Sequence, residues 1–339
     1  MKRVPGPSSR LLAAGLAAAI AASACGPAFA QDTAPAQVPA GAGPGEALSM
    51  PSLRPTVSGT EETGDPGARA YAAYQRGYYL TAKALAEPLA KLGDPAAQAL
   101  LGDLYQNGLG VTPDVDEAAR WFEAAAKSGD HTAELNFAML LLSGTGVARD
   151  EARALKLLKS AADAKLPLAE FNYAQLLIRT SPASGFEEAV PYFRSAADAG
   201  IADAQYAMSQ LLASGRGGEE SLPKAREWLR RAAINGFEIA EIEYGIWLLN
   251  GKGGPANQPE GFRFLERAAL RGNPIAINRV AHLYKDGLGT APDTAEAAKW
   301  AVVAKRLDNS DPVLDDFFEG LSDEARKSAL EEANRFTTG

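Results

Sequence analysis

The stretch AQALLGDLYQNGLGV at residues 97–111 decides the fold, because altered copies of it return five more times along the chain. A small residue in the middle of each copy marks the register, and it recurs at intervals of 36, 36, 35, 36 and 36 residues. These six reference positions are Gly102, Ala138, Ala174, Ser209, Gly245 and Ala281. A period of this length is typical of a solenoid of stacked helical pairs, in which each repeat buries its apolar face against its neighbours.

Each copy predicts two helices joined by a turn. An alanine stands five residues before the reference position, and the residues one before and two after it are apolar, which places one apolar stripe on a first helix, helix A. A glycine pair such as Gly108 and Gly110 then predicts a turn, because glycine adopts positive φ without steric cost. Asp114 and Glu117 have the spacing of a capping box and predict the start of a second helix, helix B. One unit departs from the pattern, with Pro182 where a glycine is expected.

The composition divides the rest of the chain into further segments. Six prolines and no helical or strand period lie in residues 31–66, which predicts a disordered tether. Residues 67–93 predict a helical hairpin that resembles a tetratricopeptide unit, and the six repeats occupy residues 94–307. Residues 308–339 predict a polar helical cap, which the end of a solenoid requires. We therefore expect an all-α protein.

The N-terminus has the parts of a secretory signal peptide at residues 1–30. Three basic residues lie in the first ten, an apolar run of 14 residues follows at 11–24, and Ala28 and Ala30 predict cleavage after Ala30. Cleavage removes three cations and no acid, which lowers the formal net charge from −8 to −11. We expect a periplasmic or secreted protein with no transmembrane segment in the mature chain, since a span needs about 20 apolar residues. The alternative is a lipoprotein, retained through a lipid on Cys25, the single cysteine.

The repeat pattern resembles the Sel1-like repeat, a relative of the tetratricopeptide repeat, over about 210 residues. The resemblance implies a right-handed α-solenoid that acts as an adaptor in multiprotein complexes, and exported bacterial members act in envelope signalling, polar organisation or host contact. One branch with cysteine-bridged repeats is linked to penicillin binding and β-lactam hydrolysis, and this chain lacks those cysteines. In the first repeat, the resemblance rests on Ala97, Gln98, Leu101, Gly102, Tyr105, Gly108, Gly110, Val111, Asp114, Ala118, Trp121, Ala125 and Gly129.

No group of residues has the spacing of a catalytic, metal or cofactor site. His131 and His282 lie outside any metal-ligand spacing, and we interpret both as surface histidines. The run at 215–218 has no preceding strand and no Lys-Ser/Thr ending, so it predicts a turn and not a phosphate loop. We therefore expect a non-enzyme with no cofactor and no metal. The acidic net charge also argues against nucleic acid as a partner.

A second stripe on helix A lies three residues before, one after and four after the reference position. It is apolar in the middle repeats and polar in the end repeats, which is the pattern of a groove for a partner helix. The alternative is that these side chains only pack against the neighbouring A helices. The residues predicted to bind a partner are Leu135, Met139, Leu142, Phe171, Ile178, Tyr206, Ile242, Ile246 and Leu249.

The sequence thus predicts an exported scaffold that binds a protein or peptide partner of the cell envelope on the concave face of its solenoid. This prediction of function rests on the architecture together with the family resemblance. The alternative function is a hydrolase of the cell wall or of β-lactams, which the missing cysteines and the lack of a nucleophile with a base disfavour.

Overall fold

The computed structural model describes residues 65–181 and 184–336. The predicted signal peptide, all of the predicted tether up to residue 64, Cys25 and Pro182 lie outside the described residues. Within these ranges the secondary structure consists of sixteen α-helices and contains no strand. The predicted all-α class and its succession of packed helical pairs are confirmed.

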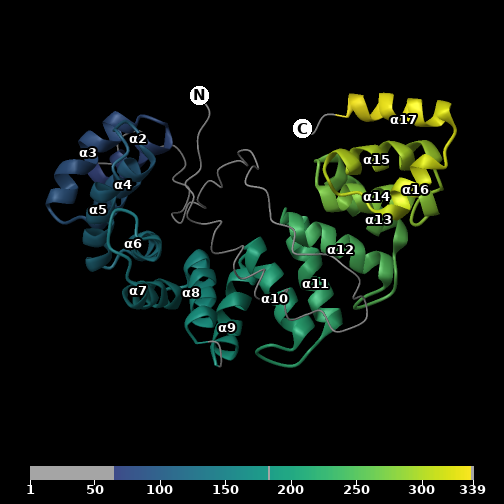
Figure 1. The fold of residues 1–339 in the computed structure, drawn as a ribbon. Coiled ribbons are helices and arrows are strands. Elements are labelled where there is room, and N and C mark those ends of the chain that lie inside the picture. The colour runs from purple at the N-terminus through teal and green to yellow at the C-terminus, as the bar shows by residue number, and fades with distance from the viewer. Residues whose placement is uncertain (1–64, 182–183, 337–339) are drawn as a thin grey trace. The chain divides into compact units, whose positions relative to one another are not determined.

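The helices form two compact units, and the boundary between them falls between Gly185 and Phe186. In the first unit, each helix packs against the next one along the chain, as Figure 1 shows for the segment from α2 to α8. Its helices are α2 (Pro66–Gln75), α3 (Tyr79–Lys91), α4 (Pro95–Asn107), α5 (Val115–Lys127), α6 (His131–Ser143), α7 (Glu151–Asp163) and α8 (Pro167–Thr180).

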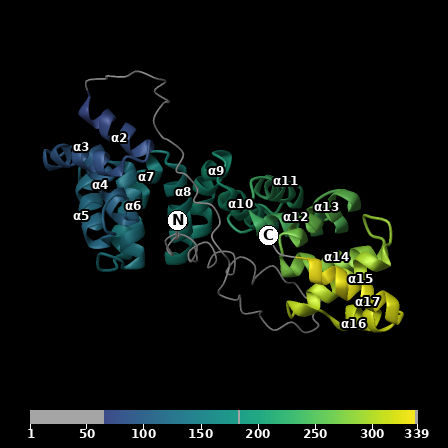
Figure 2. The same ribbon diagram turned by 90° about the horizontal axis from the view of Figure 1, so that it is seen from above.

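The second unit repeats this arrangement and ends in a shorter helix followed by a final long one. Figure 2 shows α16 and α17 beside α15 at the end of this unit. Its helices are α9 (Gly185–Asp198), α10 (Ala202–Ser214), α11 (Leu222–Ile234), α12 (Glu238–Asn250), α13 (Gln258–Leu270), α14 (Pro274–Asp286), α15 (Thr294–Arg306), α16 (Pro312–Glu319) and α17 (Asp323–Arg335). The A helices are α4, α6, α8, α10, α12 and α14, and the B helices are the odd-numbered ones from α5 to α15.

The helix ends follow from the capping residues. Asp114 Oδ1 accepts a hydrogen bond from the backbone N–H of Glu117 at 2.9 Å, which satisfies one of the free donors at the start of α5. Five of the A helices end at a glycine in the left-handed conformation, as Gly108 does with φ of 64°. The exception is α8, which runs to Thr180 and ends at Ser181 with φ of −134°. The turn after α8 therefore differs from the others, as its sequence predicts.

The small reference residue is where helix A meets helix B of the same repeat. A Cβ atom added to Gly102 would lie 2.6 Å from the ring of Phe122 on α5, and that ring is fully buried. At the equivalent Gly245, the nearest atom is Cγ of Leu265 on α13, at 3.0 Å. The 36-residue period therefore reports a close approach of two helices, which only a small side chain permits.

The second glycine of each pair joins consecutive repeats. Gly146 has φ of 72°, and a Cβ atom there would lie 2.4 Å from the carbonyl oxygen of Val115 at the start of the preceding B helix. Gly289 stands in the same relation to Gln258 O, at 2.3 Å. The turn between helices A and B thus lies directly against the first turn of the previous helix B, so glycine is needed for space as well as for φ.

A buried polar side chain four residues before the reference position joins helix A to a neighbouring helix through hydrogen bonds or ion pairs. Gln98 Nε2 donates to Ala90 O at 3.0 Å, and Gln205 Nε2 donates to Ala197 O at the same distance. Each bond gives a second partner to a carbonyl group near the end of the preceding helix, because Ala90 O and Ala197 O also accept from the backbone N–H of a glycine three residues on. Glu241 occupies this position in α12 and binds the guanidinium groups of Arg267 and Arg271.

Candidate functional site

The nine residues predicted to bind a partner lie on A helices, and most of them are buried. Met139, Ile246 and Leu249 remain half-buried. Ile242 belongs to the core of the second unit, and Ile246 and Leu249 pack against the same cluster. These contacts favour the packing alternative for the buried residues. The side chains that are only 5 to 8% exposed are Leu135, Leu142, Phe171, Ile178, Tyr206 and Ile242.

The partly exposed part of this stripe in the second unit lies beside a polar cluster between α10 and α12. Gln210 Nε2 donates to Glu243 Oε2 at 2.9 Å. Burial raises the pKa of the Tyr206 hydroxyl, and the nearby Glu243 carboxylate, with which it forms a hydrogen bond, raises it further. Tyr206 also packs on Phe237, with ring centroids 4.9 Å apart. The cluster therefore fixes the Glu243 carboxylate between two helices, at a half-buried position.

The first histidine lies in a cluster of a hydroxyl, a carboxylate and an imidazole. Glu134 Oε1 accepts a hydrogen bond from Ser160 Oγ at 2.9 Å, and its Oε2 lies 2.8 Å from His131 Nδ1. The carboxylate thus stands between the hydroxyl and the ring. A nucleophilic triad needs the imidazole in the middle, because the ring nitrogen must take the proton of the hydroxyl. The cluster has the arrangement of a structural tie between α6 and α7, which sequence reasoning from single residues did not find.

The second histidine lies at the end of the repeat array. His282 Nε2 lies 2.8 Å from Asp311 Oδ2, which also accepts a hydrogen bond from Asn278 Nδ2 at 3.0 Å. These contacts join α14 to the N-cap residue of α16. Neither histidine belongs to a group of three or more potential metal ligands, and no such group occurs among the residues that the structure describes.

Exposed aliphatic side chains gather on the turns between B and A helices of the second unit. Ile234 and Leu270 end α11 and α13, and Ile239 and Ile275 stand at the second positions of α12 and α14. Their exposed fractions are 50 to 59%. We name these four residues the aliphatic row. The equivalent positions hold Lys127, Thr132, Asp163 and Leu168 in the first unit and Asp198 and Asp203 at the start of the second.

Hydrogen bonds between neighbouring turns hold the row in place. Asn273 Nδ2 donates to Glu238 Oε1 at 2.8 Å, and Asn309 Nδ2 donates to Pro274 O at 2.5 Å. Each bond joins one turn to the turn 35 residues away. The row is thus a preformed set of exposed aliphatic side chains, and we take it as a candidate surface for another protein. The sequence carries a signal for the row, since both of its positions become aliphatic only in the last repeats. Sequence reasoning from the A helices alone did not identify it.

Comparison with known proteins agrees with this architecture. The family model described as Sel1 repeat matches six segments of the chain. They span residues 95–130, 131–166, 168–201, 202–237, 239–273 and 274–309. No curated protein matches the sequence.

Two solved structures resemble the protein over most of its length. One is a Sel1 repeat protein from Oxalobacter formigenes, with 25% identity and a TM-score of 0.61, and the match covers 71% of this chain and 99% of that one. The other is a protective antigen present in uropathogenic Escherichia coli strains, with 23% identity and a TM-score of 0.53, and its match covers 76% of this chain and 64% of that one. The second likeness shows the fold alone. None of the helices in the described ranges has the length and apolar character needed to cross a membrane.

Proposed function

Because the chain belongs to the Sel1 repeat family, we propose that it is an exported scaffold that binds a protein partner in the bacterial cell envelope. The described residues supply a stacked array of helices, and such arrays act mainly through the surfaces they present. The observation that carries the proposal is the aliphatic row, in which four side chains stay half exposed among the residues that the structure describes. Export rests on the signal-like pattern of residues 1–30, with cleavage after Ala30 and a lipid on Cys25 as the alternative.

The occupant of the row is proposed to be one amphipathic helix of the partner. The row spans two equivalent turns, one between α11 and α12 and one between α13 and α14. Each turn has one aliphatic residue before it and one after it. A helix with apolar residues at spacings of three, four and seven presents a stripe of matching linear form. Arg271 lies between Leu270 and Ile275, pairs with Glu241 and is still exposed, so an acidic residue beside the apolar stripe suits this surface.

Only the half-buried residues of the A-helix stripe, Met139, Ile246 and Leu249, are proposed as a second part of the binding surface. Ile246 comes three residues after Glu243 on α12, and the Glu243 carboxylate suits a basic side chain of the partner. The six buried residues of the stripe are proposed to act through packing. No observation favours hydrolysis of the cell wall or of β-lactams, because Ser160 is bound by a carboxylate and not by an imidazole.

Site-specific photocrosslinking in the intact cell tests the proposal. The photoreactive amino acid p-benzoylphenylalanine replaces Ile275 in one variant of the full-length protein and the exposed Lys224, on α11, in a matched control. We expect a discrete protein adduct from position 275, recovered in the envelope fraction, and none from position 224. The adduct should disappear when Ile239→Asp is added. Equal adducts at both positions, or no adduct at position 275, would contradict the proposal.

A further inference from the structure

The last three helices border a half-open cavity of about 370 Å³ within the second unit. The cause is the difference in helix length. At about 1.5 Å of rise per residue, the 8 residues of α16 reach about 12 Å, whereas α15 has 13 residues and reaches about 20 Å. A space is therefore left beside α15, between α16 and α17. The volume lies within the range of about 300–1,000 Å³ that is usual for small-molecule sites.

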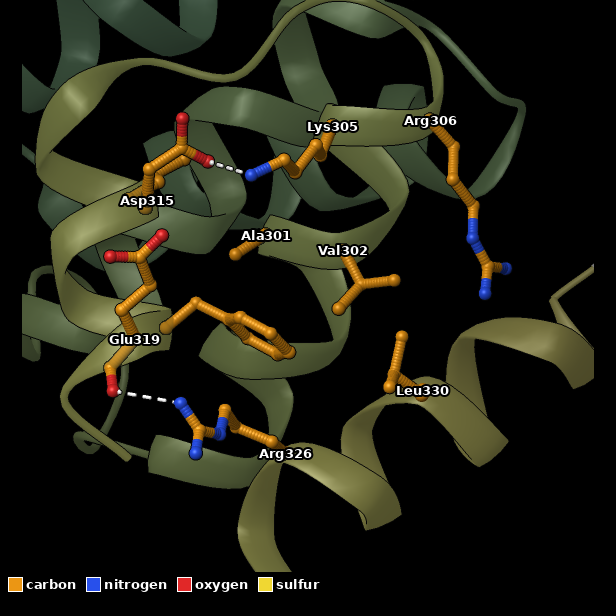
Figure 3. A pocket seen from close by; sticks show the side chains of 10 residues that line it. Ala301, Val302, Lys305, Arg306, Asp315, Glu319, Arg326 and Leu330 are labelled. Atoms are coloured by element: carbon orange, nitrogen blue, oxygen red, sulfur yellow. Dashed lines mark hydrogen bonds and ion pairs between the residues drawn. The ribbon is translucent and has the colours of Figure 1, made fainter. Parts of the chain in front are cut away.

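The floor and one wall of the cavity are apolar. Ala301 and Val302 on α15, Leu314 and Phe318 on α16, and Leu330 on α17 line it. Figure 3 shows Ala301, Val302 and Leu330 facing the same space. Leu330 is 43% exposed at the mouth, so a ligand that entered would cover apolar surface that is now in water.

Charged groups stand around this apolar space, and cations outnumber acids. Lys305 Nζ lies 3.2 Å from Asp315 Oδ1, so these two charges neutralise each other. Arg326 Nη1 donates to the carbonyl oxygen of Glu319 at 3.1 Å, as Figure 3 shows, and its Nη2 pairs with the carboxylate of Asp323.

Arg306 differs from the other two cations. Its Nη1 donates to Ala333 O at 2.9 Å and its Nη2 to Asn334 Oδ1 at 2.7 Å, and both acceptors are uncharged. Among the ion pairs of the described residues, none involves the Arg306 guanidinium. Its two bonds to the end of α17 hold the group in place at the edge of the cavity. A fixed positive charge beside an apolar space is the complement of an amphipathic anion.

We propose that this cavity binds an aliphatic carboxylate, with the chain on the apolar floor and the carboxylate on Arg306. The proposal is independent of the aliphatic row, since the two surfaces share no residue. The same chemistry occurs in a free fatty acid and in the C-terminal leucine of a peptide. In both, the carboxylate accepts hydrogen bonds from the guanidinium while the apolar part leaves water.

Calorimetric titration of the full-length protein with octanoate tests the cavity directly. Octanol and octylammonium have the same chain and serve as matched probes of the head group. We expect saturable binding of octanoate, about fivefold weaker binding of octanol, and no binding of octylammonium, because a solvent-exposed charged hydrogen bond contributes a factor of this order. Equal or tighter binding of octylammonium, or no octanoate binding at millimolar concentration, would overturn the proposal.

Three variants separate the cavity from the general surface. Arg306→Gln should remove the preference for octanoate over octanol, whereas Arg263→Gln, on the exposed side of α13, should keep it. Leu330→Glu places an acid at the exposed mouth, and should exclude octanoate while admitting octylammonium. Ala301→Leu adds bulk to the apolar floor and should weaken the binding of every probe. If Ala301→Leu does not fold, Leu330→Glu still tests whether octanoate binds in this cavity. Unchanged octanoate binding by Leu330→Glu would overturn the proposal.

A pair of short peptides distinguishes the two sources of the carboxylate. Gly-Gly-Leu with a free C-terminus and its C-terminal amide differ only in the head group. Binding of octanoate alone assigns the cavity to a free aliphatic acid, and binding of the free peptide as well, but not of the amide, extends it to a protein C-terminus. Binding of the amide as tightly as the free peptide would contradict the role of Arg306.

Discussion

The imidazole of His282 lies 2.8 Å from the carboxylate of Asp311, and this contact joins the last A helix to the start of the C-terminal cap. Partial burial of Asp311 disfavours its charged form. Hydrogen bonds from His282, from Asn278 and from the backbone N–H of Leu314 favour that form more strongly, and together they lower the pKa of Asp311 to about 2.

This lowered pKa predicts a loss of stability in acid. The unfolded chain takes up a proton on an aspartate near pH 4, whereas folded Asp311 resists protonation down to about pH 2. The contact therefore stabilises the fold fully above about pH 4, and its contribution is lost as the pH falls towards 2. Between pH 4 and pH 2 we expect the thermal midpoint of wild type to fall by about 2–4 °C more than that of Asp311→Asn, a modest effect because the Asp311 side chain is about one third exposed.

Circular dichroism melts at pH 5, 4, 3 and 2 measure this difference. The exposed Asp316 on α16 gives the matched control, because it forms no ion pair with any residue that the structure describes. Asp316→Asn should follow the wild-type profile. Identical pH profiles for Asp311→Asn and wild type would contradict the role of the His282 contact.

The buried carboxylate of Glu241 predicts a larger effect at neutral pH. It is 3% exposed and binds both Arg267 and Arg271 on the end of α13, so Glu241→Ala leaves a cavity and removes both ion pairs. The two arginines are about half exposed and can be solvated, which limits the cost to about 2 kcal/mol. Urea unfolding measures it, with the exposed Glu187→Ala as control. A loss below about 0.5 kcal/mol would show that the ion pairs do not stabilise the repeat.

The glycines provide a matched comparison of space and backbone conformation. Gly129 and Gly146 both have positive φ, 84° and 72°, but a Cβ atom at 129 meets nothing within 4 Å, whereas at 146 it meets Val115 O at 2.4 Å. Gly129→Ala should therefore cost only the left-handed strain of about 1 kcal/mol. Gly146→Ala should cost at least about 3 kcal/mol, because the turn must also move away from α5. Equal losses in urea unfolding would contradict the close approach.

The sequence was sufficient for the fold because each repeat position has a physical cause visible in one chain. The small residue at Gly102 is required where α4 meets Phe122, and the spacing of such residues predicts the stacking without any contact being known. The nature of the binding surface was harder to predict. Ile242 and Ile246 belong to one stripe in the sequence, yet Ile242 lies in the core and Ile246 at its edge, since exposure depends on the neighbouring helices.

The cavity and the aliphatic row also depend on contacts between helices that the sequence pattern does not specify. The cavity depends on how far α16 reaches along α15, and helix length at the end of an array has no periodic signal. The aliphatic row has a signal at Ile239 and Ile275, but only the structure shows that these side chains stay about half exposed in the part of the chain that it describes. The second glycine, such as Gly146, was expected for its φ alone, while its approach to Val115 became apparent only from packing.

The processing of the N-terminus gives a further prediction, which is independent of the repeat fold. Cleavage after Ala30 predicts a mature chain that begins at Gln31 and contains no cysteine. The intact mass of the protein from the periplasmic fraction measures this directly, and Cys25→Ser should leave both mass and fractionation unchanged. An N-terminal peptide that begins with acylated Cys25 would instead establish the lipoprotein alternative.

The two candidate surfaces give opposite predictions for the same kind of substitution. Ile242→Asp buries a charge in the core of the second unit, and we expect it to cost at least about 3 kcal/mol and to lower the thermal midpoint strongly. Ile275→Asp changes a side chain that is 55% exposed, so we expect a change within about 0.5 kcal/mol together with loss of the photocrosslinked partner. Ile246→Asp and Met139→Asp, at half-buried positions, test the stripe itself. If they leave the thermal midpoint unchanged and abolish partner capture while Ile275→Asp does not, then the partner binds the A helices and not the turns.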